Sequence, residues 1–126
     1  GDEGKAGGGN RKSMNILQEL NTLLDAIPIR VETGVFSDTA PDEYAVITPL
    51  TDDFPLFGDN QPEYETQEVR LSLYSKGNYL SMKNKVVNAL LNKGFTITGR
   101  QYIAHEDDTG YHHYAVDTAK LYRLED

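Results

Sequence analysis

The 126-residue chain contains no cysteine, which excludes both a disulfide framework and a zinc site built from thiolates. It also lacks an apolar run long enough to cross a bilayer, so we expect no membrane contact and synthesis in the cytoplasm. It has no glycine-rich phosphate loop, no H-E-x-x-H pair and no G-x-S-x-G turn. These absences lead us to predict a protein that is not an enzyme and has no cofactor.

Basic residues are scarce in this chain: 12 Lys and Arg stand against 20 Asp and Glu, which gives a net charge of −8. A domain that binds nucleic acid usually carries a basic patch, so we do not expect specific binding to DNA or RNA. Acidity mostly favours solubility. Two sharper interpretations stay open, an acidic surface that meets a basic partner and one that mimics a phosphate backbone.

The first thirteen residues differ from the rest of the chain. They are rich in glycine and have no apolar periodicity. We therefore interpret residues 1–13 as a flexible leader or an expression scar and expect a single domain over residues 14–126.

Apolar periodicity predicts two helices. The first runs over residues 14–27, has Leu17 in its apolar stripe and takes Ser13 as its N-cap. The second runs over residues 78–92, is capped by Asn78 and has a stripe that Leu91 widens. The core that we predict around the second helix consists of Val69, Leu71, Leu73, Met82, Val86 and Leu90.

Alternating apolar residues and turn signals predict the strands. The resulting order is α-β-β-β-α-β-β. It predicts an α+β fold, a mostly antiparallel sheet of about five strands with two helices packed on one face. The predicted strands cover residues 29–36, 44–50, 64–74, 95–105 and 111–124.

A long loop is predicted over residues 51–63, where Asp, Pro and Gly surround an apolar Phe-Pro-Leu-Phe segment. Loops of this length are often functional, and apolar residues at a loop tip commonly mark a partner surface. In the alternative, Phe54 and Phe57 fold back onto the core. Spacing of the loop carboxylates does not match an EF-hand, which disfavours calcium. The candidate contact residues are Asp52, Asp53, Phe54, Leu56, Phe57 and Asp59.

The turn of the last hairpin is the other polar cluster. If it closes across residues 107–110, His105 and His112 lie opposite one another. Two imidazoles and a carboxylate can ligate a divalent metal. Hairpin tips are commonly polar, however, and we favour a solvated tip without a metal. The candidate partner residues here are His105, Asp107, Asp108, Tyr111 and His112.

Residues 67–95 carry a family resemblance. They combine a strand V-x-L-x-L-Y-S, a break, a helix with V-V-x-x-L-L, and K-G-F. An L-x-x-L-L helix, Ile-Pro and a Tyr-Ala-Val-Ile strand precede them, and a hairpin ending in LYRL follows. Over residues 14–124 this order resembles the small tail-completion, or tail-terminator, proteins of long-tailed bacteriophages and prophages. The resemblance rests on element order and apolar positions, not on an invariant motif.

The resemblance implies structural work and brings no active-site residues. Such proteins assemble as a ring, often a hexamer, on the head-proximal end of the tail tube. The ring stops tube polymerisation and takes part in joining tail to head. The implied partners are the tail-tube protein, the head connector protein and further copies of the chain, which can be a monomer in isolation. The implied location is the host cytoplasm during assembly and then the virion. The alternative function is an acidic DNA mimic or inhibitor that binds a basic partner.

Overall fold

The computed structural model describes residues 15–32, 41–53 and 64–123, with the backbone alone for residues 51–53 and 123. The predicted leader, residues 1–13, lies outside these ranges. The elements are α1 (Ile16–Ala26), β2 (Val31–Glu32), β3 (Glu43–Asp53), β4 (Tyr64–Ser75), α2 (Tyr79–Asn92), β5 (Thr96–His105) and β6 (His112–Arg123).

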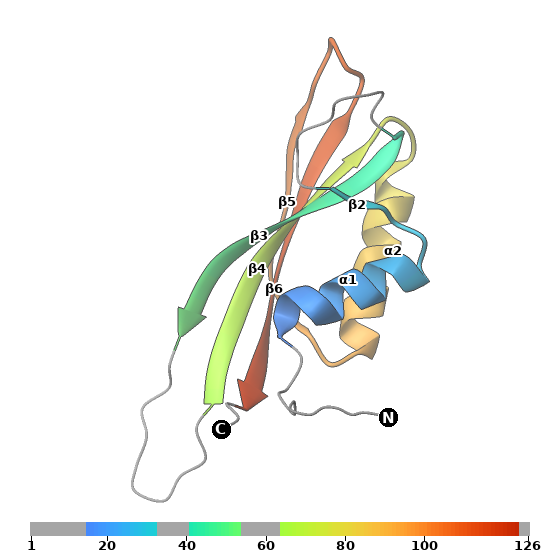
Figure 1. Ribbon diagram of the computed structural model, residues 1–126. Coiled ribbons are helices and arrows are strands. Elements are labelled where there is room, and N and C mark those ends of the chain that lie inside the picture. Colours follow the sequence, from blue (N-terminus) through green and yellow to red (C-terminus); the bar gives the residue numbers. More distant parts are fainter. Residues whose placement is uncertain (1–14, 33–40, 54–63, 124–126) are drawn as a thin grey trace, which may run out of the picture.

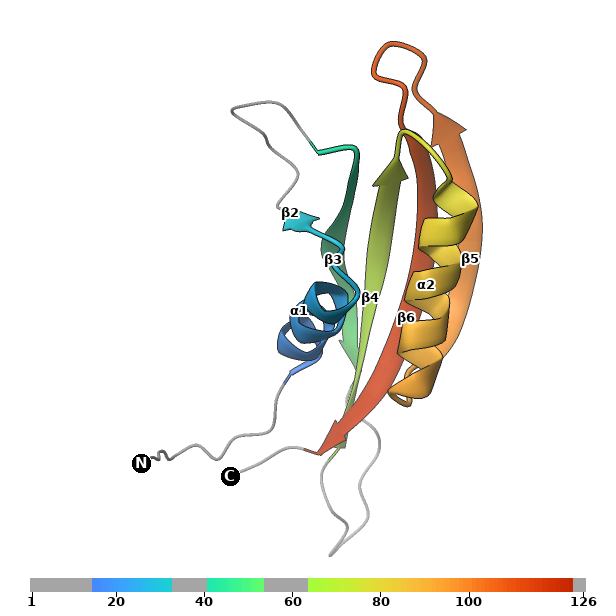
Figure 2. The same ribbon diagram turned by 90° about the vertical axis from the view of Figure 1, so that its right-hand side faces the viewer.

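The predicted α+β fold is confirmed. Five strands form one sheet in the order β2-β3-β4-β6-β5, in which only β2 and β3 are parallel. Both helices lie on the same side of the sheet (Figure 1). Helix α1 contacts β2 and β4, whereas α2 contacts β4, β5 and β6. The hairpin of β5 and β6 extends beyond the helical layer at one end, and β4 and the end of β6 extend beyond it at the other (Figure 2).

Helix α1 begins one residue after its N-cap, Asn15. The side chain of Asn15 accepts a hydrogen bond from the Gln18 N–H (2.9 Å), and the Gln18 side chain accepts one from the Asn15 N–H (3.1 Å). This reciprocal capping box satisfies two N–H groups that the helix leaves unpaired. The prediction of Ser13 as N-cap was therefore wrong. Leu17 is 37% exposed, so the buried stripe of α1 is narrower than predicted.

Helix α2 begins and ends where the sequence predicts. Asn78 accepts a hydrogen bond from the Ser81 N–H (3.0 Å), which confirms it as the N-cap. Gly94 follows the helix with a φ of 83°, a left-handed conformation that glycine adopts without strain. Leu91, however, is 54% exposed and does not widen the buried stripe.

The core lies between the sheet and the two helices, and β4 runs through its middle. Successive side chains of a strand point to opposite faces, so alternate residues of β4 face the helices. All six predicted core residues are at most 2% exposed. They are Val69, Leu71 and Leu73 of β4 and Met82, Val86 and Leu90 of α2.

Strand β3 continues into the predicted loop, which corrects the assignment of Asp52 and Asp53. After a register shift between Pro49 and Thr51, these two residues pair with Gln67 and Thr66 of β4. Aspartate is a poor strand former, but the backbone partners supplied by the start of β4 outweigh that preference. Strand β2, predicted over residues 29–36, is described only at Val31–Glu32, because residues 33–40 lie outside the described ranges.

Candidate functional site

The tip of the β5–β6 hairpin has the predicted register. The Glu106 N–H donates to the Tyr111 carbonyl (2.8 Å), and the Gly110 N–H donates to the Glu106 carbonyl (2.7 Å). Gly110 has a φ of 84°, which suits a tight turn. The turn places His105 directly opposite His112, so the predicted pairing of the two histidines is confirmed.

The two imidazoles lie in contact, with ring centroids 4.5 Å apart. The Nδ1 atom of His105 lies 3.1 Å from the Asp107 Oδ1 atom, and the Nδ1 atom of His112 lies 3.0 Å from the Tyr102 hydroxyl. Tyr79 at the start of α2 stacks on His112 with centroids 4.8 Å apart. The His112 ring therefore lies on the helix side of the sheet. Asp107 orients the His105 ring, and Tyr102 and Tyr79 orient the His112 ring.

Two acidic candidates occupy the same turn. The side chain of Asp107 is 98% exposed despite its contact with the His105 ring, and Asp108 is exposed as well. Both carboxylates are therefore accessible to a partner, which their selection from the sequence as candidate partner residues requires. Their contact with a partner stays a prediction.

The face of the sheet opposite the helices carries an aromatic cluster. Tyr44, Tyr74 and His113 stack across three strands, with centroids 4.7 Å apart for the tyrosines and 4.4 Å for Tyr74 and His113. Tyr111 meets Tyr44 edge-on at 5.4 Å, and its hydroxyl donates to the Pro41 carbonyl. Tyr111 is only 5% exposed, so in the single chain it packs inside this cluster. Its predicted role at a partner surface stays a prediction for an assembled state.

Burial sets the titration behaviour of this cluster. It raises the pKa of Tyr44 to about 12, with smaller contributions from Tyr74 and Tyr111. Burial also lowers the pKa of His113 below 6.5, because a charged imidazole loses its hydration there. The Nε2 atom of His113 is buried without a hydrogen-bond partner among the described residues. These surroundings therefore favour the neutral form of His113.

The remaining candidates come from the predicted loop. Asp52 and Asp53 lie at the end of β3, as described above, at the end of the sheet opposite the hairpin tip. Phe54, Leu56, Phe57 and Asp59 lie outside the described residues. Among the described candidates, the structure therefore brings the His105 group together and places Asp52 and Asp53 at the other end of the sheet.

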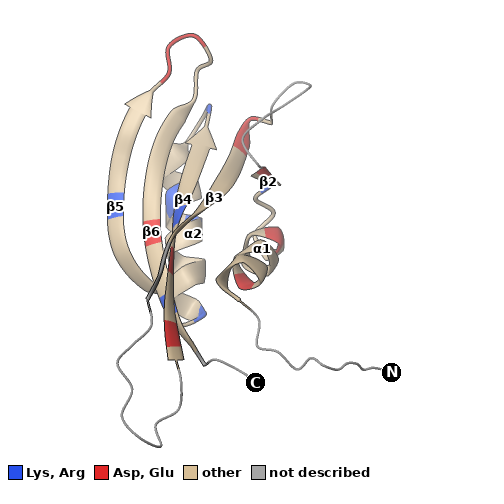
Figure 3. Cartoon of the chain, turned by 60° about the vertical axis from the view of Figure 1, so that its left-hand side comes forward, with Lys and Arg blue, Asp and Glu red and all other residues tan. Residues whose placement is uncertain are grey.

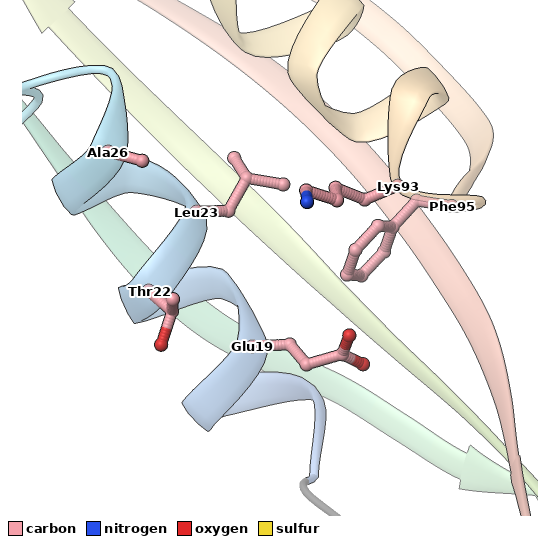
Figure 4. Close-up of a pocket in the computed structure, with 6 residues that line it drawn as sticks. All are labelled: Glu19, Thr22, Leu23, Ala26, Lys93 and Phe95. Atoms are coloured by element: carbon pink, nitrogen blue, oxygen red, sulfur yellow. The ribbon is translucent and has the colours of Figure 1, made fainter.

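A cavity between the helices was not predicted. Its volume is about 210 Å³, and it lies between α1 and the segment that follows α2 (Figure 4). Leu23 of α1 and Phe95 form apolar walls, and the side chains of Glu19 and Lys93 lie at its sides. Thr22 and Ala26 of α1 complete the lining.

Glu19 ties α1 to the sheet beside this cavity. Its Oε1 atom accepts a hydrogen bond from the Tyr122 hydroxyl (2.5 Å), and its Oε2 atom accepts one from the Lys120 ammonium group (3.0 Å). The same ammonium group donates to the Lys93 carbonyl (3.2 Å) and lies 4.7 Å from the centre of the Phe95 ring. Burial, and then the bond to Glu19, raises the pKa of Tyr122. The sequence contains one signal for this anchoring role of Glu19: its carboxylate lies one turn from Ile16, beside the apolar stripe of the helix.

Strand β5 forms one edge of the sheet and pairs only with β6 in the described chain. It is ten residues long, has no proline and carries Arg100 as its single Lys, Arg, Asp or Glu residue. Two register shifts interrupt its pairing, between Ile97 and Gly99 and between Tyr102 and Ala104. Tyr102 and Ile103 are 41% and 40% exposed. Such an edge can accept another strand along the regular stretch between the shifts.

The opposite edge of the sheet is guarded. Within the described ranges, strand β2 pairs with two residues of β3, and the Ala45 N–H donates to the Arg30 carbonyl (2.8 Å). Successive N–H groups of a strand point alternately to its two sides. The Ala45 N–H points towards the outer side of β3, and position 49, four residues later, would direct its N–H to the same side. Proline has no N–H to offer, and a register shift follows it directly. This edge therefore resists the addition of a strand.

Acidic side chains are dispersed over the described residues. Figure 3 shows them on separate elements, among them the hairpin tip, the start of β3, β6 and α1. A DNA mimic requires carboxylates gathered on one face at phosphate-like spacing, and this dispersal disfavours that alternative. No group of three or more His, Cys, Asp or Glu residues in the described ranges is placed to hold a metal. No helix in those ranges is long and apolar enough to cross a membrane.

No family model matches the sequence, and no curated protein matches it. Among solved structures, the chain is similar to one in the virion of a native gene transfer agent particle, with a TM-score of 0.46 and 10% identity. That match covers 87% of this chain and 91% of the other. At this TM-score and identity the similarity carries no argument about function.

Proposed function

We propose that this protein is a structural component of virion assembly that works through contacts with other proteins and not through catalysis. In the proposal it forms a ring on the head-proximal end of a phage tail tube, ends tube growth and takes part in joining tail to head. The tail-tube protein and the head connector protein are its proposed partners. Six is the number of subunits that the family resemblance implies.

The observation that carries the proposal is the difference between the two sheet edges. A subunit that joins identical copies head to tail must present two different surfaces, because the contact is heterologous. Among the described strands, β5 is an edge strand that pairs with β6 alone, whereas Pro49 removes an N–H from the β3 edge and disfavours strand addition there. A molecule with unlike edges suits a ring of like-oriented subunits.

Two further features support the proposal. The α+β order that carries the family resemblance is the order of elements in the fold. The net charge of −8 also suits a ring through which DNA passes, since an acidic lumen repels phosphates and does not retain them. Assembly in the host cytoplasm, followed by residence in the virion, belongs to the same proposal.

Electron microscopy of phage particles that lack the protein tests the proposal. We expect overlong tails, or tails that fail to join heads, and wild-type protein supplied in trans should restore normal particles. Deletion of residues 53–59, which are the last residue of β3 and the following part of the predicted 51–63 loop, should abolish assembly onto tails and leave the purified chain folded. Particles of normal length and joining without the protein would overturn the proposed function.

A further inference from the structure

We propose that His105 and His112 form a binding site for a divalent transition metal such as Cu²⁺ or Zn²⁺ at the tip of the β5–β6 hairpin. The site is independent of the proposed role in assembly. It uses two of the three histidines in the chain and supplies two imidazole ligands, one from each strand.

The hairpin register provides the proximity. His105 and His112 are direct cross-strand partners, and their ring centroids lie 4.5 Å apart with planes inclined at 40°. A metal ion binds imidazole nitrogen at about 2.0–2.1 Å, so two nitrogens that share an ion lie within roughly 4 Å of one another. Rings in contact at this separation can meet that requirement through small rotations of the exposed His105 and the half-buried His112 side chains. The site therefore needs no rearrangement of the backbone.

The hydrogen bonds of the two rings determine which nitrogen is available. In each ring the Nδ1 atom already has a partner, the Asp107 carboxylate for His105 and the Tyr102 hydroxyl for His112. A neutral imidazole that donates from Nδ1 keeps its lone pair on Nε2. Both histidines can thus present Nε2 to a metal while Nδ1 keeps its hydrogen bond to Asp107 or Tyr102.

This arrangement matches the surroundings of metal-binding histidines in general. Such residues usually donate their second ring nitrogen to a carboxylate or another acceptor, which fixes the tautomer and strengthens the ligand. Tyr79 adds a further constraint, because its ring stacks on His112 at 4.8 Å. Glu106, Asp107 and Asp108 in the same turn raise the local concentration of cations.

The number of ligands defines the kind of ion and the strength of binding. Imidazole favours copper, nickel and zinc over magnesium or calcium, which prefer oxygen. With two protein ligands, water fills the remaining positions, so the site is open and weaker than a structural zinc site with four. Copper should bind more tightly than zinc at a site of this type.

Calorimetric titration of the full chain with CuCl₂ and ZnCl₂ at pH 7.5 tests the site. We expect one ion per chain and a loss of affinity of at least about tenfold in His105→Gln and in His112→Gln, because each variant removes one of two ligands. The control is His113→Gln, which changes the third histidine on the opposite face of the sheet. Circular dichroism establishes that each variant is folded.

Nitrogen-15 NMR of the three imidazoles provides a second readout that does not depend on the variants. The Nε2 signals of His105 and His112 should shift or broaden on addition of Zn²⁺, and those of His113 should not. Asp107→Asn should weaken binding by about tenfold, since it removes the carboxylate behind His105. Absence of binding, or equal binding by wild type and both hairpin variants, would overturn the proposal.

Discussion

The two edges of this sheet differ in how well they are protected against pairing with another strand. An edge strand exposes unpaired N–H and C=O groups that another chain can pair with. In the described residues, the β3 edge carries the parallel strand β2 and Pro49, which has no N–H to offer a further strand. The β5 edge has only its two register shifts, and it leaves Tyr102 and Ile103 exposed. The difference shows that one side of the molecule is protected against pairing while the other is left available.

The largest effect that we expect concerns α1, the helix that packs beside the β2–β3 edge of the sheet. Tyr122→Phe removes the hydrogen bond from the Tyr122 hydroxyl to Glu19, which anchors α1 to β6. A buried hydrogen bond to a charged group contributes about 1.5–3 kcal/mol, so the free energy of unfolding should fall by that amount. Urea denaturation measures the loss, and hydrogen exchange locates it.

The two edges of the sheet should respond differently to this change. Amide exchange should accelerate in α1 and β2, which pack together, and change little in β5. Equal acceleration at both edges would show that α1 does not selectively brace the β3 side.

A smaller effect is expected from opening the guarded edge. Pro49→Thr restores an N–H that faces outward from β3 and suits a strand. The free energy of unfolding should change by less than about 1 kcal/mol, whereas self-association should increase. Sedimentation velocity at several concentrations measures the association. An unchanged distribution of species would contradict the protective role of Pro49.

The smallest effect is a dependence on pH in the aromatic cluster that joins β3 to the centre of the sheet. Burial holds the pKa of His113 below 6.5, while Glu106 opposes this shift and Arg70 adds to it. In the unfolded chain the imidazole returns to about 6.5 and takes up its proton first. Stability from this group is thus complete above about pH 7 and is lost as pH falls towards the lowered pKa.

Urea denaturation between pH 7.5 and pH 5.5 measures this dependence. His113→Phe keeps an aromatic ring beside Tyr74 and removes the titrating group, so the variant should lose less stability over this range than the wild type. The same pH profile for both proteins would mean that His113 does not titrate differently on folding.

Local signals in the sequence predicted much of the fold. Asn78 and Gly94 mark the ends of α2 through interactions within one turn, and both were identified. The opposition of His105 and His112 followed from the length of a short turn. The helix-side core of β4 followed from alternation. In each case the determining neighbours lie close along the chain or repeat with a fixed period.

The features that the sequence did not reveal depend on distant partners. Asp52 and Asp53 extend β3 because the start of β4 offers them backbone groups, against their own preference for a loop. Glu19 acquires its role from Tyr122, 103 positions later in the chain. Neither local propensity nor periodicity contains such information. For the candidate contact site, the prediction reached the correct hairpin register but not the burial of Tyr111.

Photo-cross-linking in assembled tails tests most directly whether β5 is the contact edge. A photoreactive residue is placed at Gln101, which is exposed on β5 between the two register shifts, and at Asn88, which is exposed on α2, as the control. Our account predicts cross-links from position 101 to a neighbouring copy or to a tail protein, and few or none from position 88. Cross-links from position 88 alone, or equal yields from both positions, would contradict it.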